Sequence, residues 1–104
     1  MRLRDFFEDY YDDKGIYIVH VRHTEMYLLM VYDGGLSYVV YNISKEEANN
    51  IIEGKIDKDS IINRNDVALT LLELEECVSE KILQKLKDLD DAEKKQITKV
   101  KKDN

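Results

Sequence analysis

Three closely spaced segments in the first half of the chain constrain the fold more than any other feature of the sequence. Residues 16–22 (IYIVHVR), 26–32 (MYLLMVY) and 36–43 (LSYVVYNI) are rich in β-branched and aromatic residues, and each has the length of a strand. Asp-Gly-Gly at 33–35 supplies the positive φ angles that a tight hairpin turn needs. Residues 23–25 join the first two segments in the same way. We therefore expect an antiparallel run of three strands.

Ser44 marks the start of a helix after the third strand. Its hydroxyl can accept a hydrogen bond from the amide of Glu47, whose carboxylate can reach back to the Ser44 amide to form a capping box. The helix is predicted over residues 45–53, and Gly54 supplies the left-handed residue that ends it. Residues 56–62 are predicted to form a turn that is anchored by isoleucines.

Three further elements follow from the spacing of apolar residues. Residues 3–11 place apolar side chains at offsets of three and four, which is typical of a short helix. Residues 66–74 (DVALTLLEL) alternate like a fourth strand, and Ser79 can cap a last helix. The apolar face of that helix consists of Ile82, Leu83, Leu86 and Leu89.

The order of these elements predicts the fold class. Strands come as a run and are followed by helices, which favours α+β over a parallel α/β sheet. We predict a single antiparallel sheet of about four strands, with two to three helices packed on one face. Residues 1–93 would form one domain, and residues 94–104 a basic C-terminal tail that frays.

Charge and cysteine content limit the classes of function. The segment 94–104 carries five lysines and one aspartate, which gives it a net charge of +4. Because the whole chain has a net charge of −6, residues 1–93 have a net charge of −10. A body this acidic disfavours direct binding of nucleic acid. We find no apolar leader and no stretch long enough to cross a bilayer, and Cys77 is the only cysteine. We therefore expect a cytoplasmic protein with no membrane partner, in which Cys77 is a half-buried structural thiol.

The string VRHTEM at 21–26 raises the question of catalysis. It resembles the phosphate-binding signature of the histidine phosphatases, but those enzymes need a second histidine far downstream and a chain about twice as long. A metal site built from His20, His23 and Glu25 is disfavoured, because residues three apart on a strand lie on opposite faces. We interpret these residues as polar groups at a hairpin bend. We predict no catalytic residue, metal site or cofactor, and hence no enzyme.

Tyrosine is the unusual residue of this composition, with seven Tyr against two Phe and no Trp. A tyrosine buries a large ring and keeps a polar tip, which suits a half-exposed surface that meets a partner. The alternative is that strands simply favour tyrosine. The residues that we predict to bind a partner are Tyr17, Tyr27, Tyr38, Tyr41, Ile82, Leu86 and Leu89.

Three sequence strings also carry a resemblance to a known family. They are YYD at 10–12, MYLLMVYD at 26–33 and YNISKEEANNIIEGKID at 41–57. Over residues 10–74 the pattern resembles a family of short bacterial and phage domains of unknown function. The resemblance implies an intracellular α+β module with no known activity, and it transfers no catalytic residue. The chain lacks the prolines that this family often has after the YYD and before the capping serine, and the last helix lies outside the match.

These observations leave three hypotheses of function. The first is a small, acidic, non-catalytic protein-interaction module, of a kind that a phage or mobile element could encode. It would occupy the surface of a host protein, for example one that binds nucleic acid. The alternative is a homo-oligomeric structural or accessory domain, a homodimer for instance, that pairs through the last helix or a sheet edge. The third is a small metal-dependent hydrolase around His20, His23 and Glu25.

Overall fold

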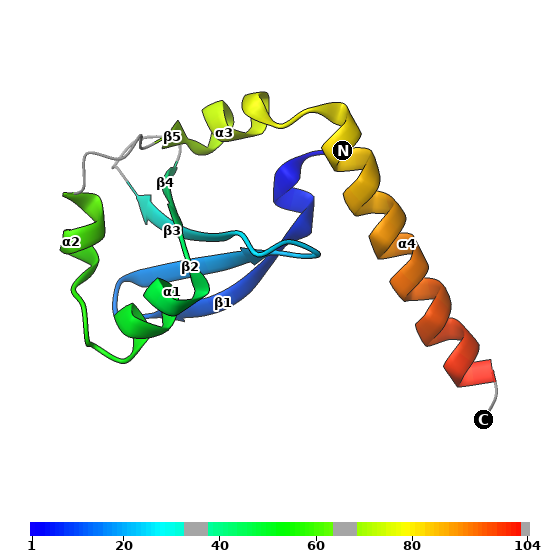
Figure 1. Cartoon of the computed structure of the whole chain (residues 1–104), viewed down its shortest axis with the longest axis horizontal. Helices are drawn as coiled ribbons and strands as arrows, with labels where there is room; N and C mark the ends of the chain where they lie inside the picture. Colours follow the sequence, from blue (N-terminus) through cyan, green and yellow to red (C-terminus); the bar gives the residue numbers. More distant parts are fainter. Residues whose placement is uncertain (33–37, 64–68, 103–104) are drawn as a thin grey trace.

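The structure is built on one antiparallel sheet with strand order β1-β2-β3-β4-β5, so each strand lies beside the next one along the chain (Figure 1). The computed structural model describes residues 1–32, 38–63 and 69–102, with backbone only for 96–102. The strands are β1 (Phe7–Asp13), β2 (Ile16–Val21), β3 (Tyr27–Tyr32), β4 (Tyr38–Ile43) and β5 (Leu69–Thr70). The predicted α+β class with a single antiparallel sheet is confirmed, and the sheet has five strands.

Helices cover both faces of this sheet, whereas we predicted helices on one face only. They are η1 (Leu3–Phe6, a 3-10 helix), α1 (Lys45–Ile52), α2 (Lys58–Ile62), α3 (Leu71–Cys77) and α4 (Glu80–Lys102). Side chains of η1, α3 and α4 pack on the side that we call the η1 face. Side chains of α1 and α2 pack on the opposite side, the α1 face.

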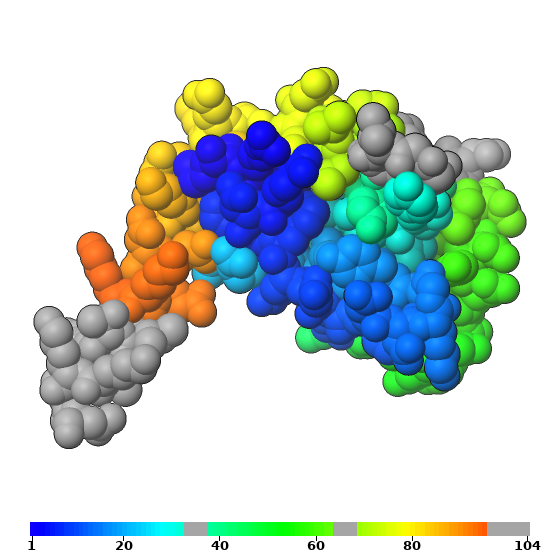
Figure 2. All heavy atoms as spheres, turned by 180° about the vertical axis from the view of Figure 1, so that it is seen from behind, coloured from blue at the N-terminus to red at the C-terminus, as the bar shows by residue number. Residues whose placement is uncertain are grey.

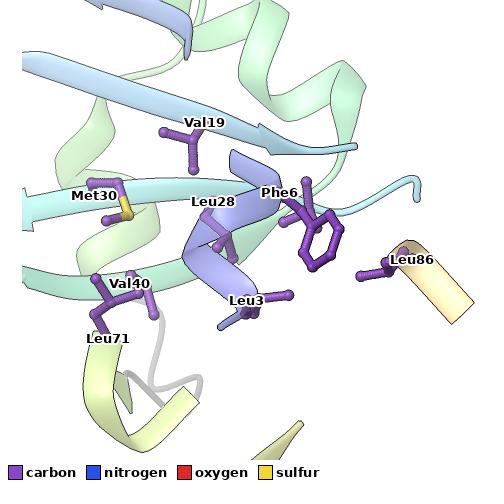
Figure 3. Packing of buried hydrophobic residues seen from close by; sticks show 9 residues of the cluster. Leu3, Phe6, Val19, Leu28, Met30, Val40, Leu71 and Leu86 are labelled. Atoms are coloured by element: carbon purple, nitrogen blue, oxygen red, sulfur yellow. The ribbon is translucent and has the colours of Figure 1, made fainter. Parts of the chain in front are cut away.

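The central strand β3 explains why both faces need a cover. Leu28 and Met30 point into the core of the η1 face, whereas Tyr27 and Leu29 point into the core of the α1 face. The η1-face core (Figure 3) consists of Leu3, Phe6, Val19, Val21, Leu28, Met30, Val40, Leu71 and Leu86. The α1-face core consists of Ile18, Tyr27, Leu29, Ile43, Ala48, Ile51 and Ile61. Burial of one such aliphatic or aromatic side chain stabilises the fold by about 1.5–3 kcal/mol.

The N-terminal segment differs from its prediction. Only Leu3–Phe6 is helical, and the rest of the predicted helix 3–11 belongs to the edge strand β1. A β-bulge between Asp9 and Tyr11 breaks the pairing with β2, and Tyr10 and Tyr11 both pack on the α1 face. A bulge adds one residue to a strand, so the apolar spacing drifts from two towards the three and four of a helix. That drift produced the wrong prediction.

The predicted fourth strand also ends early. Strand β5 covers Leu69–Thr70, and helix α3 then begins at Leu71, while residues 66–68 lie outside the described residues. The hydroxyl of Thr70 accepts a hydrogen bond from the amide of Glu73 at 3.2 Å, which caps the new helix. The predicted turn at 56–62 likewise contains the short helix α2. The Asp-Gly-Gly turn at 33–35 lies outside the described residues.

The capping box at Ser44 is confirmed. The Ser44 hydroxyl accepts a hydrogen bond from the Glu47 amide at 3.1 Å, and the Glu47 carboxylate accepts one from the Ser44 amide at 3.0 Å. Gly54 has φ +75°, the left-handed conformation that was expected after α1.

We expect Ser44→Ala to lower the free energy of unfolding by about 1 kcal/mol, because the first turn of α1 loses a partner for one amide. Urea denaturation followed by circular dichroism measures this change. Ser60→Ala in α2 is the matched control, since the side chain of Ser60 is exposed, and its effect should stay within about 0.5 kcal/mol. Equal effects of the two variants would contradict the role of the cap.

Helix α4 is the longest element and leaves the sheet along its C-terminal half (Figure 1). Its backbone is helical to Lys102, across the boundary at residue 93 that we predicted, and the fraying of the tail stays a prediction. In the described part of the chain, no helix combines the length and the apolar character that a membrane crossing requires.

Candidate interaction surface

Three tyrosines are joined by ring contacts through Tyr38 at one end of the η1 face. Tyr32 and Tyr38 are directly paired between β3 and β4, and their ring centroids lie 5.8 Å apart. The Tyr17 ring, from β2, lies 6.2 Å from that of Tyr38. Tyr32 is 64% exposed and Tyr38 is 37% exposed. Figure 2 shows atoms of β2 and β3, in blue to cyan, at the surface beside the N-terminal residues. We call these three residues the tyrosine strip.

Two carboxylates lie beside this strip. Asp9 and Asp12 of β1 pair with Val19 and Tyr17 of β2, and paired residues in an antiparallel sheet share a face. The Tyr17 hydroxyl donates a hydrogen bond to Asp9 at 2.9 Å. Burial raises the pKa of Tyr17 to about 12, together with the hydrogen bond to Asp9 and the negative charges of Asp9 and Asp12. We call the strip with these two aspartates the acidic tyrosine surface.

The structure divides the four tyrosines that we predicted to bind a partner. Tyr17 and Tyr38 belong to the tyrosine strip. Tyr27 is only 7% exposed and stacks on His20 in the α1-face core, at 4.6 Å between ring centroids. Tyr41 packs half-buried against the same core. Alternate residues of a strand point to opposite faces, so these tyrosines form no common surface.

Three residues of this surface, Tyr32, Asp9 and Asp12, were not predicted from the sequence. Tyr32 could have been found from the hairpin itself, because it pairs with Tyr38 across the predicted turn. Asp9 was missed because residues 3–11 were predicted as a helix, and Asp12 because it follows directly after that helix, so neither had a register against a strand.

The apolar face of α4 is also divided. Leu86 is 4% exposed and lies beside Phe6 in the η1-face core (Figure 3). Ile82 and Leu89 are 51% and 40% exposed. They are seven residues apart and thus share one side of the helix. Leu86 is therefore a core residue, and only the other two are available to a partner.

A second polar cluster joins α4 to the turn between β2 and β3. Arg22 donates hydrogen bonds to both carboxylate oxygens of Asp90, at 2.7 and 3.3 Å. The Nε2 atom of His23 lies 2.6 Å from Asp90 and 3.6 Å from Glu93. The hydrogen bonds from Arg22 and His23 lower the pKa of Asp90 to about 2. We call these four residues the α4 clasp.

The histidines do not form the metal site that the third hypothesis requires. Both ring nitrogens of His20 have other partners, with Nδ1 2.6 Å from Glu8 and Nε2 2.7 Å from the carbonyl oxygen of Thr24. His23 sits in the turn with φ +67° and faces α4 instead. Glu25 lines a separate cavity of about 430 Å³.

The α4 clasp contains the one group of three possible metal ligands found among the described residues, namely His23, Asp90 and Glu93. Their ligand atoms lie within 4.8 Å of one another. However, both oxygens of Asp90 already accept hydrogen bonds from the guanidinium of Arg22. A metal ion bound to Asp90 would have to displace the guanidinium of Arg22, or it would be repelled by the positive charge of that group. We therefore interpret the cluster as an ion-pair network that holds α4.

Cys77 differs from its prediction as well, because it is exposed at the end of α3 rather than half-buried. The prediction failed together with that of the fourth strand, since it placed Cys77 at a strand-to-helix junction.

Comparisons with known proteins leave the site to be interpreted from its own geometry. No family model, curated protein or solved structure matches this chain. The resemblance of residues 10–74 to a family of short bacterial and phage domains therefore stays a prediction.

Proposed function

We propose that this protein is a non-catalytic protein-interaction module and that the acidic tyrosine surface is where it contacts its partner. The partner would be a protein whose surface the module occupies, and a phage or mobile element is the origin that fits such a role. A cytoplasmic location is part of the proposal, supported by the single cysteine, Cys77.

The observation that carries this proposal is the contact of three tyrosine rings across β2, β3 and β4, with most of Tyr32 still exposed. Tyrosines have few rotatable bonds, so they bury a large area on binding at a low cost in conformational entropy. Cross-strand aromatic pairs also stabilise a hairpin, by about 0.2–1 kcal/mol. Stabilising the hairpin does not require the rings to reach solvent. The Tyr32 ring is 64% exposed, so most of its surface can contact another molecule.

Site-specific photocrosslinking tests this proposal. We expect a benzophenone amino acid at position 32 of the full chain, expressed in its native cells, to give one discrete adduct. The same group at position 55, which is exposed in the loop between α1 and α2, should not give that adduct. The same adducts from both positions, or none from position 32, would contradict binding through the tyrosine strip.

A second candidate function is homo-oligomerisation, which the exposure of Ile82 and Leu89 favours. Two copies could bury this side of α4 against each other, as paired amphipathic helices do. If so, sedimentation velocity should show a dimer that Leu89→Lys converts to a monomer. A wild-type monomer at millimolar concentration would exclude this function.

A further inference from the structure

We infer that the partner of the acidic tyrosine surface presents an arginine-rich segment. Such segments are typical of proteins that contact nucleic-acid phosphates. The inference rests on the proposed function and adds the chemistry of the partner to it.

Charge complementarity is the first argument. Asp9 and Asp12 are exposed on the η1 face, next to Tyr17. The Tyr17 hydroxyl donates a hydrogen bond to Asp9, and Asp12 is paired with Tyr17 across β1 and β2. A cationic partner side chain would gain attraction at this end of the sheet, whereas a phosphate or a carboxylate would be repelled.

The combination of carboxylates with aromatic rings is the second argument. A guanidinium is planar, so it can lie flat on a tyrosine ring and direct its N–H groups at a neighbouring carboxylate. Tyr38 and Tyr32 offer exposed rings, and Asp12 offers an exposed carboxylate opposite Tyr17, whose ring contacts that of Tyr38. Neighbouring arginines of one segment would therefore meet both kinds of group. A lysine ammonium lacks the planar stacking and binds water more strongly, so it gains less from the same surface.

The third argument is that only one face of β1 adjoins the tyrosine strip. The face of Asp9 and Asp12 continues directly into Tyr17 of β2 and then, by ring contact, into the strip. The next aspartate, Asp13, pairs with Ile16, whose side chain packs against the α1-face core. With Glu8, which pairs with His20, Asp13 gives this other face of β1 two acidic residues, as many as Asp9 and Asp12 give the η1 face. Only the face of Asp9 and Asp12 adjoins the tyrosine strip.

Fluorescence anisotropy with defined probes tests the inference. The full chain is titrated against labelled nonapeptides of arginine, lysine and glutamate at about 150 mM salt, where long-range attraction between exposed charges is screened. We expect the arginine peptide to bind about fivefold more tightly than the lysine peptide, and the glutamate peptide not to bind. Equal affinity for the arginine and lysine peptides would overturn the assignment to arginine.

Matched variants locate the binding. Asp12→Asn and Tyr32→Ala should each weaken binding of the arginine peptide about fivefold. Asp13→Asn makes the same change of charge one residue away on the other face, and it should leave binding unchanged. An equal loss with Asp12→Asn and Asp13→Asn would overturn the inference, because the attraction would then come from the acidic body as a whole.

The two proposals can fail separately. A discrete crosslink from position 32 without binding of the arginine peptide would overturn this inference and leave the proposed function in place. The surface could instead bind the basic C-terminal segment of a second copy of this chain. In that case the protein should self-associate in sedimentation and should prefer the lysine peptide, because residues 94–104 hold five lysines and no arginine. Preference for the lysine peptide would exclude an arginine-rich partner, whereas a dimer that Leu89→Lys abolishes would be assigned to α4 and not to this surface.

Discussion

Phe6→Ala is expected to lower the free energy of unfolding by about 3–5 kcal/mol. Phe6, the last residue of η1, is 3% exposed and lies in the η1-face core beside Leu86 of α4 (Figure 3). The guanidinium of Arg22 lies over its ring, 5.7 Å from the centroid. The carbonyl oxygen of Phe6 also accepts a hydrogen bond from the Arg22 amide at 2.9 Å. Alanine keeps this backbone hydrogen bond, but it loses the ring that contacts Arg22 and packs in the core with Leu86 of α4, which leaves a cavity.

Equilibrium urea denaturation measures this loss, with Leu72→Ala as the control. Leu72 is a large apolar residue that is 57% exposed on α3, so its truncation should change stability by less than about 0.5 kcal/mol. A Phe6→Ala effect below about 1 kcal/mol would show that the junction of η1 and α4 contributes little to the fold. The expected loss is a large fraction of the total stability of a chain of this size.

Asp90→Asn is expected to destabilise the protein at neutral pH and to remove part of its sensitivity to acid. The carboxylate accepts two hydrogen bonds from Arg22 and lies 2.6 Å from Nε2 of His23. Its side chain is 16% exposed. Charged hydrogen bonds of this kind contribute about 1–3 kcal/mol, with the lower end expected near a surface. Asp91→Asn, at the exposed neighbouring position, should change stability by less than about 0.5 kcal/mol.

The direction of the pH effect follows from the pKa of Asp90, which lies at about 2 in the folded protein against an ordinary value of 3.8. A carboxyl group whose pKa is lower in the folded state stabilises the fold fully above its ordinary pKa. The stabilisation is lost as the pH falls through the folded value. The difference in unfolding free energy between wild type and Asp90→Asn should therefore be constant above about pH 5 and shrink between about pH 4 and pH 2. A difference that is unchanged over this window would contradict the α4 clasp.

A double-mutant cycle separates this clasp from simple loss of charge. Arg22→Ala and Asp90→Ala should together cost less than the sum of their separate effects, with a coupling energy of about 0.5–3 kcal/mol for groups in one network. Additive effects would mean that Arg22 and Asp90 do not act as one network, which would contradict the α4 clasp.

The strands that follow one another along the chain were predictable because their signals are local. Residues 16–22, 26–32 and 36–43 carry β-branched and aromatic side chains that need no distant partner to favour extended backbone. The capping box of Ser44 and Glu47 is likewise complete within four residues, and it was confirmed. The segment 3–11 failed because a bulge imitates helical spacing, and only pairing with β2 distinguishes the two.

The candidate surface was predicted only in part, for a related reason. The excess of tyrosine indicated an aromatic surface, and Tyr17 and Tyr38 belong to it. Sequence alone did not show that Tyr27 is a core residue. The face to which a strand residue points depends on the register against both neighbours and on which helices cover that face. These are contacts between residues far apart in the chain.

The amino-acid sequence by itself determined the fold class, the turn at residues 23–25 and the start of α1, because hydrogen bonding and steric preference within a few residues decide such features. Tertiary structure alone decided that helices cover both faces of the sheet and that Tyr32 joins Tyr17 and Tyr38 at the surface. It also decided the contact of Asp90 with Arg22 and His23, which are more than 60 residues away. Packing selects among many locally acceptable arrangements, and its energy comes from long-range burial and pairing that no short segment contains.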